Sequence, residues 1–140
     1  MDERRYSAEF RLRVTARKED IDELSHVSNI VYVRWMQDVA VAHSSSVGWT
    51  PEAYLRSGRV FVVRRHEIEY FGSAVEGDEV ELVTWIDEVT AATSLRRTRM
   101  VRVRDGAELV RGATLWVLVS TAKQRPVRIP EEILTAFSRP

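Results

Sequence analysis

The most constraining feature of this 140-residue sequence is a segment, Asn29 to Gly48, whose apolar residues fall on almost every face of a helix. A helix on a protein surface carries its apolar residues in one stripe, whereas a helix that is apolar all round is enclosed by other elements. Gly48 is a suitable C-terminal stop, and Thr50-Pro51 predicts a capped start for a second, short helix that runs to about Ser57. We therefore expect a long central helix around which the rest of the chain wraps.

Strands are predicted on both sides of these helices. Residues Ala8 to Ala16 alternate between apolar and charged side chains, a period of two that indicates a half-buried strand. Four later segments are rich in β-branched and aromatic residues: Val60–Phe71, Glu79–Val89, Ser94–Arg104 and Glu108–Val119. Turns are expected at Gly77-Asp78, at Thr90–Thr93 and at Asp105-Gly106, the last a two-residue hairpin signal, and Glu131–Phe137 is a candidate terminal helix. The fold class is α+β, a five-stranded antiparallel sheet around a long central helix.

Composition narrows the possible functions. The length suits one domain over residues 1–140, and the absence of cysteine excludes a disulfide scaffold, a thiolate zinc site and a cysteine nucleophile. With 21 basic against 21 acidic residues, binding of nucleic acid by bulk charge is not expected. The chain has no early apolar run and no apolar stretch of about 18 residues, so neither a signal peptide nor a membrane span is expected. We expect a cytoplasmic protein that uses no metal and no cofactor.

The segment from Asp20 to Tyr32, D-I-D-E-L-S-H-V-S-N-I-V-Y, carries the most informative motif. It resembles the D-x-D-x-x-G-H-V-N-N-x-x-Y signature of hotdog-fold acyl thioesterases of the 4-hydroxybenzoyl-CoA and acyl-ACP type. Asp22, His26, Val27, Asn29 and Tyr32 fall on matching positions, whereas Ser25 and Ser28 replace a glycine and an asparagine. Residues 61–78 and 112–130 also resemble the family, in the same order. The resemblance implies a hotdog fold and hydrolysis of acyl-CoA or acyl-ACP thioesters.

Asp22 is the candidate catalytic residue. It lies in a polar loop just before the long helix, so the N–H groups of the helix start point into its surroundings. These groups and the helix dipole can stabilise an oxyanion, and a carboxylate beside them can attack a thioester or activate water. The resemblance implies the same roles, with Asp22 as nucleophile or general base. Taken alone, Asp22 can also be a capping or loop-ordering carboxylate, and His26 either positions water or the thioester or holds the loop by a hydrogen bond.

Candidate substrate-binding residues are Asn29, Tyr32, Arg64 and Arg65. Asn29 is predicted to cap the long helix, and Tyr32 to belong to the core or to the wall of an apolar acyl pocket. Arg64 and Arg65 are neighbours on one strand, so only one of them is expected to face a given side. One can bind a phosphate of coenzyme A, or both can belong to a solvated, ion-paired strand face. The same alternatives apply to the arginines of the next strands: Arg96, Arg97, Arg99, Arg102 and Arg104.

Two alternative functions and one assembly follow from the same observations. A hotdog hydratase or dehydratase is disfavoured, because that branch carries Asp-x-x-x-x-His, whereas three residues separate Asp22 from His26. A non-catalytic acyl-thioester-binding module is the other alternative. His43 and His66 lie outside the motif and are interpreted as structural. The edges of a five-stranded sheet need partners, so we expect a homodimer or homotetramer with the active site near the subunit interface.

Overall fold

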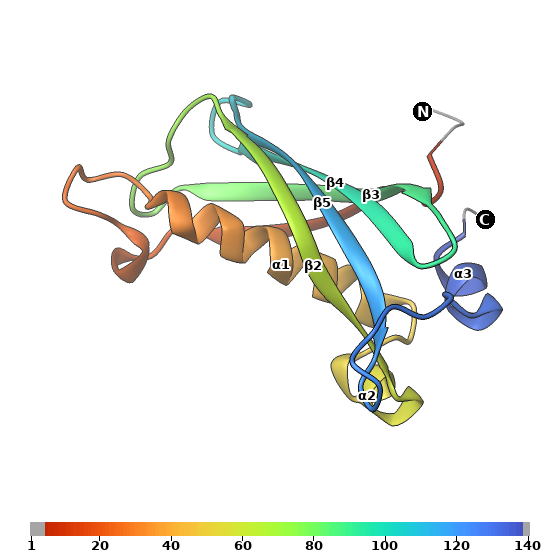
Figure 1. Cartoon of the computed structure of the whole chain (residues 1–140). Coiled ribbons are helices and arrows are strands. Elements are labelled where there is room, and N and C mark those ends of the chain that lie inside the picture. Colours follow the sequence, from red (N-terminus) through yellow and green to blue (C-terminus); the bar gives the residue numbers. More distant parts are fainter. Residues whose placement is uncertain (1–4, 139–140) are drawn as a thin grey trace.

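Five strands form one antiparallel sheet in the order β1-β3-β4-β5-β2 (Figure 1). The computed structural model describes residues 5–138. The strands are β1 (Phe10–Thr15), β2 (Arg59–Tyr70), β3 (Glu79–Val89), β4 (Thr93–Arg102) and β5 (Glu108–Ser120). Consecutive hairpins join β3, β4 and β5 in the middle, and β1 and β2 form the two edges. The predicted α+β class and strand positions are confirmed.

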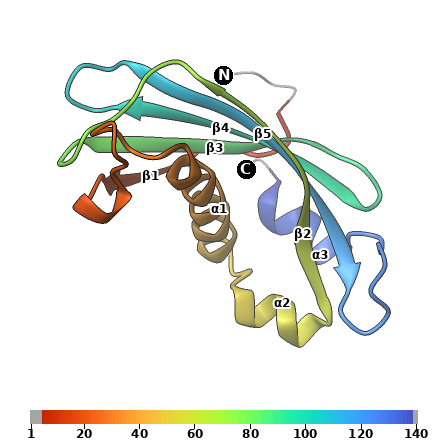
Figure 2. The same ribbon diagram turned by 60° about the vertical axis from the view of Figure 1, so that its left-hand side comes forward.

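The long helix α1 (Asn29–Ser46) lies along the concave face of the sheet (Figures 1 and 2). Its inward side chains pack with buried residues of the strands into the main core, which includes Tyr32, Trp35, Met36, Val39, Val80, Leu82, Met100, Leu109 and Val110. The expected central helix is therefore present. It is not enclosed all round in the single chain, however, because Ile30 and Val41 are exposed on its outer side.

Three short helical segments complete the chain: a 3-10 turn η1 (Lys18–Asp20), α2 (Pro51–Ser57) and α3 (Glu131–Phe137). The predicted cap of α2 is confirmed, since the Ala53 N–H donates to Thr50 Oγ1 at 3.1 Å. Both α2 and α3 lie at the C-terminal end of α1, away from η1 (Figure 2). No helix within residues 5–138 is long and apolar enough to cross a membrane.

The hairpin between β4 and β5 differs from the two-residue turn expected at Asp105-Gly106. The connection spans residues 103–107, and the Arg102 N–H donates to the Ala107 carbonyl oxygen at 2.8 Å. The Asp105 carboxylate accepts hydrogen bonds from the Arg102 guanidinium and from the Ala107 N–H, which holds the wider loop. The turn lies where the sequence predicts it, but its side-chain contacts make it longer.

The two edge strands differ in their protection. On β1 the exposed Arg11 and Arg13 form ion pairs with Glu79 and Glu81 of β3. Such charges discourage another strand from adding to an edge. On the twelve-residue β2, by contrast, Val62 and Tyr70 are exposed apolar side chains. β2 also carries exposed charges, Arg64, Arg65, Glu67 and Glu69, so the edges differ in their exposed apolar side chains and not in charge.

Candidate active site

The loop from Asp22 to Val27 is closed by its own backbone. The Asp22 N–H donates to the His26 carbonyl oxygen at 2.9 Å, and the Ser25 N–H donates to the Asp22 carbonyl oxygen at 3.0 Å. Ser25 has φ 65°, in the left-handed region that glycine adopts without strain. The backbone conformation thus explains why the similar signature has glycine at this position. Ser25 adopts the same conformation, so the loop keeps its shape despite the substitution.

The Asp22 carboxylate is half-buried and uses one of its oxygens within the loop. Oδ1 accepts the Leu24 N–H at 2.9 Å, while no side chain or N–H of residues 5–138 donates to Oδ2. Asp22 therefore orders its own loop but does not cap α1, whose N-cap is Ser28. The second carboxylate oxygen is available to water or to a ligand.

The start of α1 has no side-chain cap. Ser28 occupies the N-cap position with extended φ and ψ of −62° and 142°, and its side chain accepts no hydrogen bond there. The prediction that Asn29 caps the helix is wrong, because Asn29 is already the first helical residue, one position beyond the cap. Within residues 5–138 the N–H groups of Asn29 and Ile30 have no acceptor. They are two of the unsatisfied donors that every helix start presents.

Asp20 holds this region to α1, a role that the sequence analysis did not assign. Its side chain is only 5% exposed, with Oδ2 accepting the Arg17 N–H and Oδ1 accepting Arg34 Nη2, both at 2.9 Å. Burial alone raises the pKa of Asp20, but these hydrogen bonds and the Arg34 charge outweigh it and hold the pKa below its usual value. The sequence gives no signal for the pair, because Arg34 lies fourteen positions after Asp20.

Tyr32 belongs to the core in the single chain. Its side chain is 1% exposed, and its hydroxyl accepts the Ala74 N–H at 2.9 Å. Burial raises the pKa of Tyr32, so the hydroxyl stays protonated at neutral pH. The Ala74 carbonyl oxygen in turn accepts the Val27 N–H at 2.9 Å. Tyr32 thus supports the end of the Asp22 loop through the Ala74 segment.

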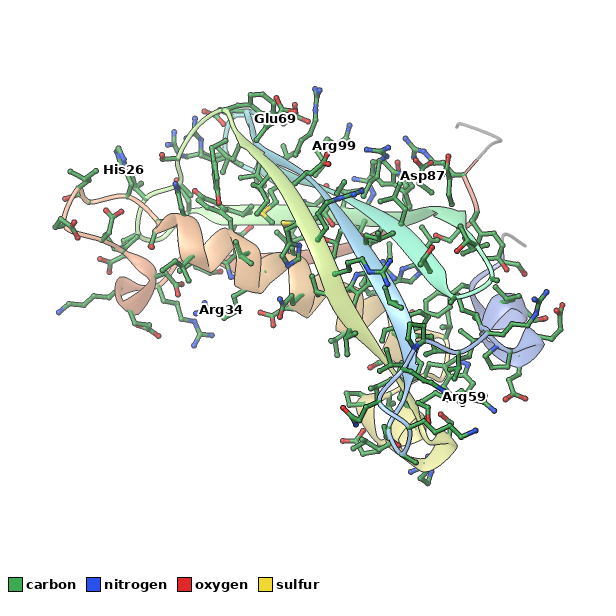
Figure 3. The ribbon with its side chains drawn as sticks, viewed as in Figure 1. His26, Arg34, Arg59, Glu69, Asp87 and Arg99 are labelled. Carbon is green, nitrogen blue, oxygen red and sulfur yellow. The ribbon has the colours of Figure 1, made fainter. Side chains whose placement is uncertain are left out.

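His26 lies exposed on the loop that precedes α1 (Figure 3). Its backbone carbonyl closes the loop on Asp22, but its ring has no hydrogen-bond partner among residues 5–138. The alternative in which the His26 ring holds the loop by a hydrogen bond is therefore wrong for the single chain. The ring is available at the surface, on the same loop as the Asp22 carboxylate.

Arg64 and Arg65 occupy a β-bulge of β2. The register shifts between Val63 and Arg65, so Arg64 has no residue opposite it on β5. The alternation that predicts only one arginine on a given side is wrong at this point, because a bulge interrupts it and both side chains are exposed. Arg65 forms a long ion pair with Glu67 at 3.5 Å, which leaves its guanidinium largely in water.

These arginines do not join Asp22 within one chain. The end of β2 that faces the start of α1 is Tyr70, whose hydroxyl donates to the Asn29 carbonyl oxygen at 3.3 Å. Arg64 lies six residues before Tyr70, about 20 Å along an extended strand. The structure therefore gathers Asp22, His26 and Asn29 at one end of α1, and it leaves Arg64 and Arg65 at the middle of the β2 edge.

At the opposite end of α1 the concave face contains a cavity of about 330 Å³. Its walls come from α1, α2, α3 and four strands, and they include Trp49, Tyr54, Phe61, Trp116, Ile133 and Phe137. Arg96, on β4, is the only charged residue among those that line it. None of the predicted site residues contributes to these walls.

Arg96 is buried, which corrects the interpretation of the β4 arginines as one solvated face. It is 5% exposed, and its Nη1 donates to His43 Nδ1 at 2.9 Å and to Thr84 Oγ1 at 3.2 Å. Because the guanidinium is always the donor, His43 accepts through Nδ1 and carries its proton on Nε2. Burial and the Arg96 charge lower the pKa of His43 to about 4, so this histidine is neutral at pH 7. Arg96 shares the inward face of β4 with Met100, but the sequence alone does not show which face is inward, because the apolar Leu95 and Val101 lie on the other face.

Comparison with known proteins identifies the family. The model of the Thioesterase-like superfamily matches residues 16–137. A chloroplastic palmitoyl-acyl carrier protein thioesterase of Arabidopsis thaliana is 26% identical over 132 residues, which are 89% of this chain and 32% of that protein. The chain spans between a quarter and a third of the length of the curated relatives that it matches.

Solved structures show the same fold. A 1,4-dihydroxy-2-naphthoyl-CoA thioesterase from Synechocystis has a TM-score of 0.86 at 16% identity, covering 93% of this chain and 96% of the other. A 12:0-ACP thioesterase from Umbellularia californica has a TM-score of 0.80 at 25% identity, covering 91% of this chain and 49% of the other. The expected hotdog fold is confirmed. Given this fold and a family match over most of its length, the chain belongs to the thioesterase-like superfamily.

Proposed function

We propose that this protein hydrolyses acyl thioesters and that Asp22 is its catalytic carboxylate. The observation that carries the proposal is the available Oδ2 of Asp22 in a loop that leads directly to an uncapped helix start. The Ile21–Val27 bridge closes that loop within one residue of the Ser28 N-cap. Membership of the thioesterase-like superfamily supports the reaction class.

The reaction needs an anion and an oxyanion site. The thioester carbonyl oxygen accepts hydrogen bonds from the Asn29 and Ile30 N–H groups, and the helix dipole favours the negative charge that develops there. Asp22 either takes a proton from water, whose oxygen attacks the carbonyl carbon, or attacks it directly and forms an anhydride that water cleaves. In both routes the C–S bond breaks, the sulfur leaves as a thiol after gaining a proton, and the acyl group leaves as a carboxylate. His26, on the same loop, positions water or the thioester.

The substrate class is acyl-CoA or acyl-ACP. Relatives named for each carrier share the fold, which supports both. Arg64 and Arg65 supply the forked donors that suit the phosphates of coenzyme A. They lie about 17–20 Å along β2 from the Tyr70 end in the same chain, and in the assembly proposed below they contact the coenzyme A bound at Asp22 of a second copy.

A homodimer through β2 would complete such a site. Large apolar side chains are exposed around the β2 edge and the start of α1: Leu24 (72%), Ile30 (79%), Val62, Tyr70 and Phe71 (51%). The apolar residues of β1, Phe10, Leu12 and Val14, are not exposed, which makes the other edge a poorer alternative. One subunit then gives Asp22 while its partner lines the pocket, and a homotetramer forms where two such dimers associate. In this assembly residues 1–140 act as one hotdog domain.

Thiol release from a panel of short, long and aromatic acyl-CoA and acyl-ACP esters tests the reaction, with native mass spectrometry to test the assembly. We expect free thiol from at least one ester and a mass of two or four chains. Binding without thiol release would indicate a non-catalytic acyl-binding module. Addition of water to an enoyl-CoA without thiol release would indicate a hydratase. A folded, active monomer at micromolar concentration would overturn the shared site.

A further inference from the structure

We propose that the cavity at the C-terminal end of α1 is a second binding site, which takes an apolar monocarboxylic acid with its carboxylate on Arg96. Within one chain the site is distinct from Asp22. His43, which bonds Arg96, lies fourteen positions along α1 from Asn29 at its start. At 1.5 Å per residue this distance is about 21 Å. The inference therefore does not depend on hydrolysis at the other end of the helix.

The charge of Arg96 points to an anionic ligand. Its guanidinium is buried, yet both of its hydrogen-bond partners, His43 and Thr84, are neutral. No Asp or Glu among residues 5–138 forms an ion pair with Arg96. A buried charge without an opposite charge is strongly unfavourable. The binding free energy of an anionic ligand therefore includes the relief of this unpaired charge.

The donor geometry of Arg96 favours a carboxylate. A guanidinium has five N–H donors, and Nη1 uses its two on His43 and Thr84. The Nε–H and both Nη2–H groups have no acceptor among the described residues. Such a planar fork matches the two oxygens of one carboxylate. A phosphate dianion would require a second cation, and the walls of the cavity contain none.

The remaining walls select an apolar body. Aromatic and aliphatic side chains surround the space next to Arg96, among them Trp49 from the α1–α2 connection, Tyr54 from α2 and Ile133 from α3. The cavity volume of about 330 Å³ lies in the lower part of the range typical of small-molecule sites. Trp116 lines the same cavity, and its buried indole N–H has no acceptor within residues 5–138. One anionic head on a modest apolar chain matches the free donors of Arg96 and the apolar walls.

Calorimetric titration of the 140-residue chain with octanoate and with 1-octanol tests the proposal. The two probes share an alkyl chain and differ in the carboxylate, so we expect octanoate to bind at least about tenfold more tightly, as for a charged hydrogen-bonded pair. Arg96→Met should remove this preference and leave the affinity for 1-octanol nearly unchanged. The matched control is Arg97→Met, on the outer face of the same strand, which should keep the preference.

Three binding results would contradict the proposal for Arg96. Equal binding of octanoate and 1-octanol by the wild-type protein overturns the proposal, whether or not the Arg96→Met protein folds. Unchanged octanoate preference in a folded Arg96→Met protein overturns it as well. Tighter binding of octyl phosphate than of octanoate would overturn the carboxylate assignment. Asp22→Asn should bind octanoate like the wild type, so a failure of the proposed hydrolysis does not affect this result.

Discussion

At the N-terminal end of α1 the carboxylates are half-exposed or paired, whereas at its C-terminal end Arg96 and His43 are buried without an acid. The first end is an open loop, with the Asp22 Oδ2 and two helix N–H groups available at the surface. Beside the second end lie α2 and α3 (Figure 2), and their side chains help to line a partly open apolar cavity. The two ends of α1 thus lie beside opposite charges: the loop carboxylate of Asp22, which reaches water, and the guanidinium of Arg96 on β4, which faces an apolar space. The N-terminal end, called the open end below, suits a reaction that consumes water. The C-terminal end, called the cavity end below, suits retention of an apolar ligand.

The largest effect on stability is expected from His43, at the cavity end. In the unfolded chain His43 has its ordinary pKa near 6.5, and in the folded protein burial and Arg96 lower it to about 4. Between these values the unfolded state binds more protons, so stability is full above pH 6.5 and falls as the pH drops towards 4. The loss attributable to His43 is about 3 kcal/mol in the free energy of unfolding.

His43→Gln isolates this contribution, because the glutamine oxygen still accepts from Arg96 but does not titrate. Urea unfolding at pH 7, 6, 5 and 4 should show a much flatter pH dependence for the variant than for the wild type. Parallel curves for the two proteins would show that His43 becomes protonated in the folded state. The cavity end would then not keep this side chain neutral.

A smaller loss is expected at the open end from Asp20→Asn. Asp20 accepts from the Arg17 N–H with one oxygen and from Arg34 with the other, whereas asparagine has only one accepting oxygen. The substitution therefore leaves one donor unsatisfied, and it also removes the charge that Arg34 binds. Leaving a buried group unsatisfied lowers the free energy of unfolding by about 1–3 kcal/mol. Because the pKa of Asp20 is held low, the wild-type advantage is present at neutral pH and disappears as the pH falls through that lowered pKa.

Urea unfolding at pH 7 measures the loss, with Glu19→Gln as the control. Glu19 is the exposed neighbour of Asp20, so its substitution should change stability by less than about 0.5 kcal/mol. Equal effects of the two substitutions would show that Asp20 does not hold the loop to α1.

The smallest effect is expected from Ser25→Gly. The left-handed φ of 65° strains serine but not glycine, so the variant should gain about 0.5 kcal/mol in the free energy of unfolding. The same change at Ser45, within α1, should lower it by a similar amount, because glycine is the poorer helix former. Thermal melting compares the stability of the two variants with that of the wild type. Lower stability of both variants would mean that the Asp22 loop is not strained.

The periodic elements were predictable from the sequence, whereas the contacts between them were not. The apolar spacing of α1, the alternation of β1 and the Thr50-Pro51 cap follow local rules, and the structure has each of them. The bulge at Arg64 and the Asp20–Arg34 pair depend on residues far apart in the sequence. The buried state of Arg96 depends on the register of β4, because β4 carries polar residues on both faces.

The site was predictable in part. The motif predicts the position of the Asp22 loop and a catalytic role for Asp22. The predicted cap at Asn29 is wrong by one residue, because Ser28 is the N-cap. The available Oδ2 of Asp22 and the unpaired N–H groups of α1 become visible only once the loop is folded. Whether Arg64 and Arg65 join the Asp22 site depends on the proposed second chain, and the sequence motif does not place the two arginines beside Asp22.

Thiol release by Asp22→Asn, under saturating amounts of the best ester of the panel, tests the central claim most directly. The amide keeps the Oδ1 that accepts the Leu24 N–H, so the loop should persist, and stability should change by less than about 1 kcal/mol. It removes the anion, so hydrolysis should fall at least about 100-fold. Glu23→Gln, at the exposed neighbouring acid, should retain wild-type activity. Hydrolysis within a few-fold of wild type by a normally folded Asp22→Asn protein would contradict the account, because Asp22 would then only order its loop.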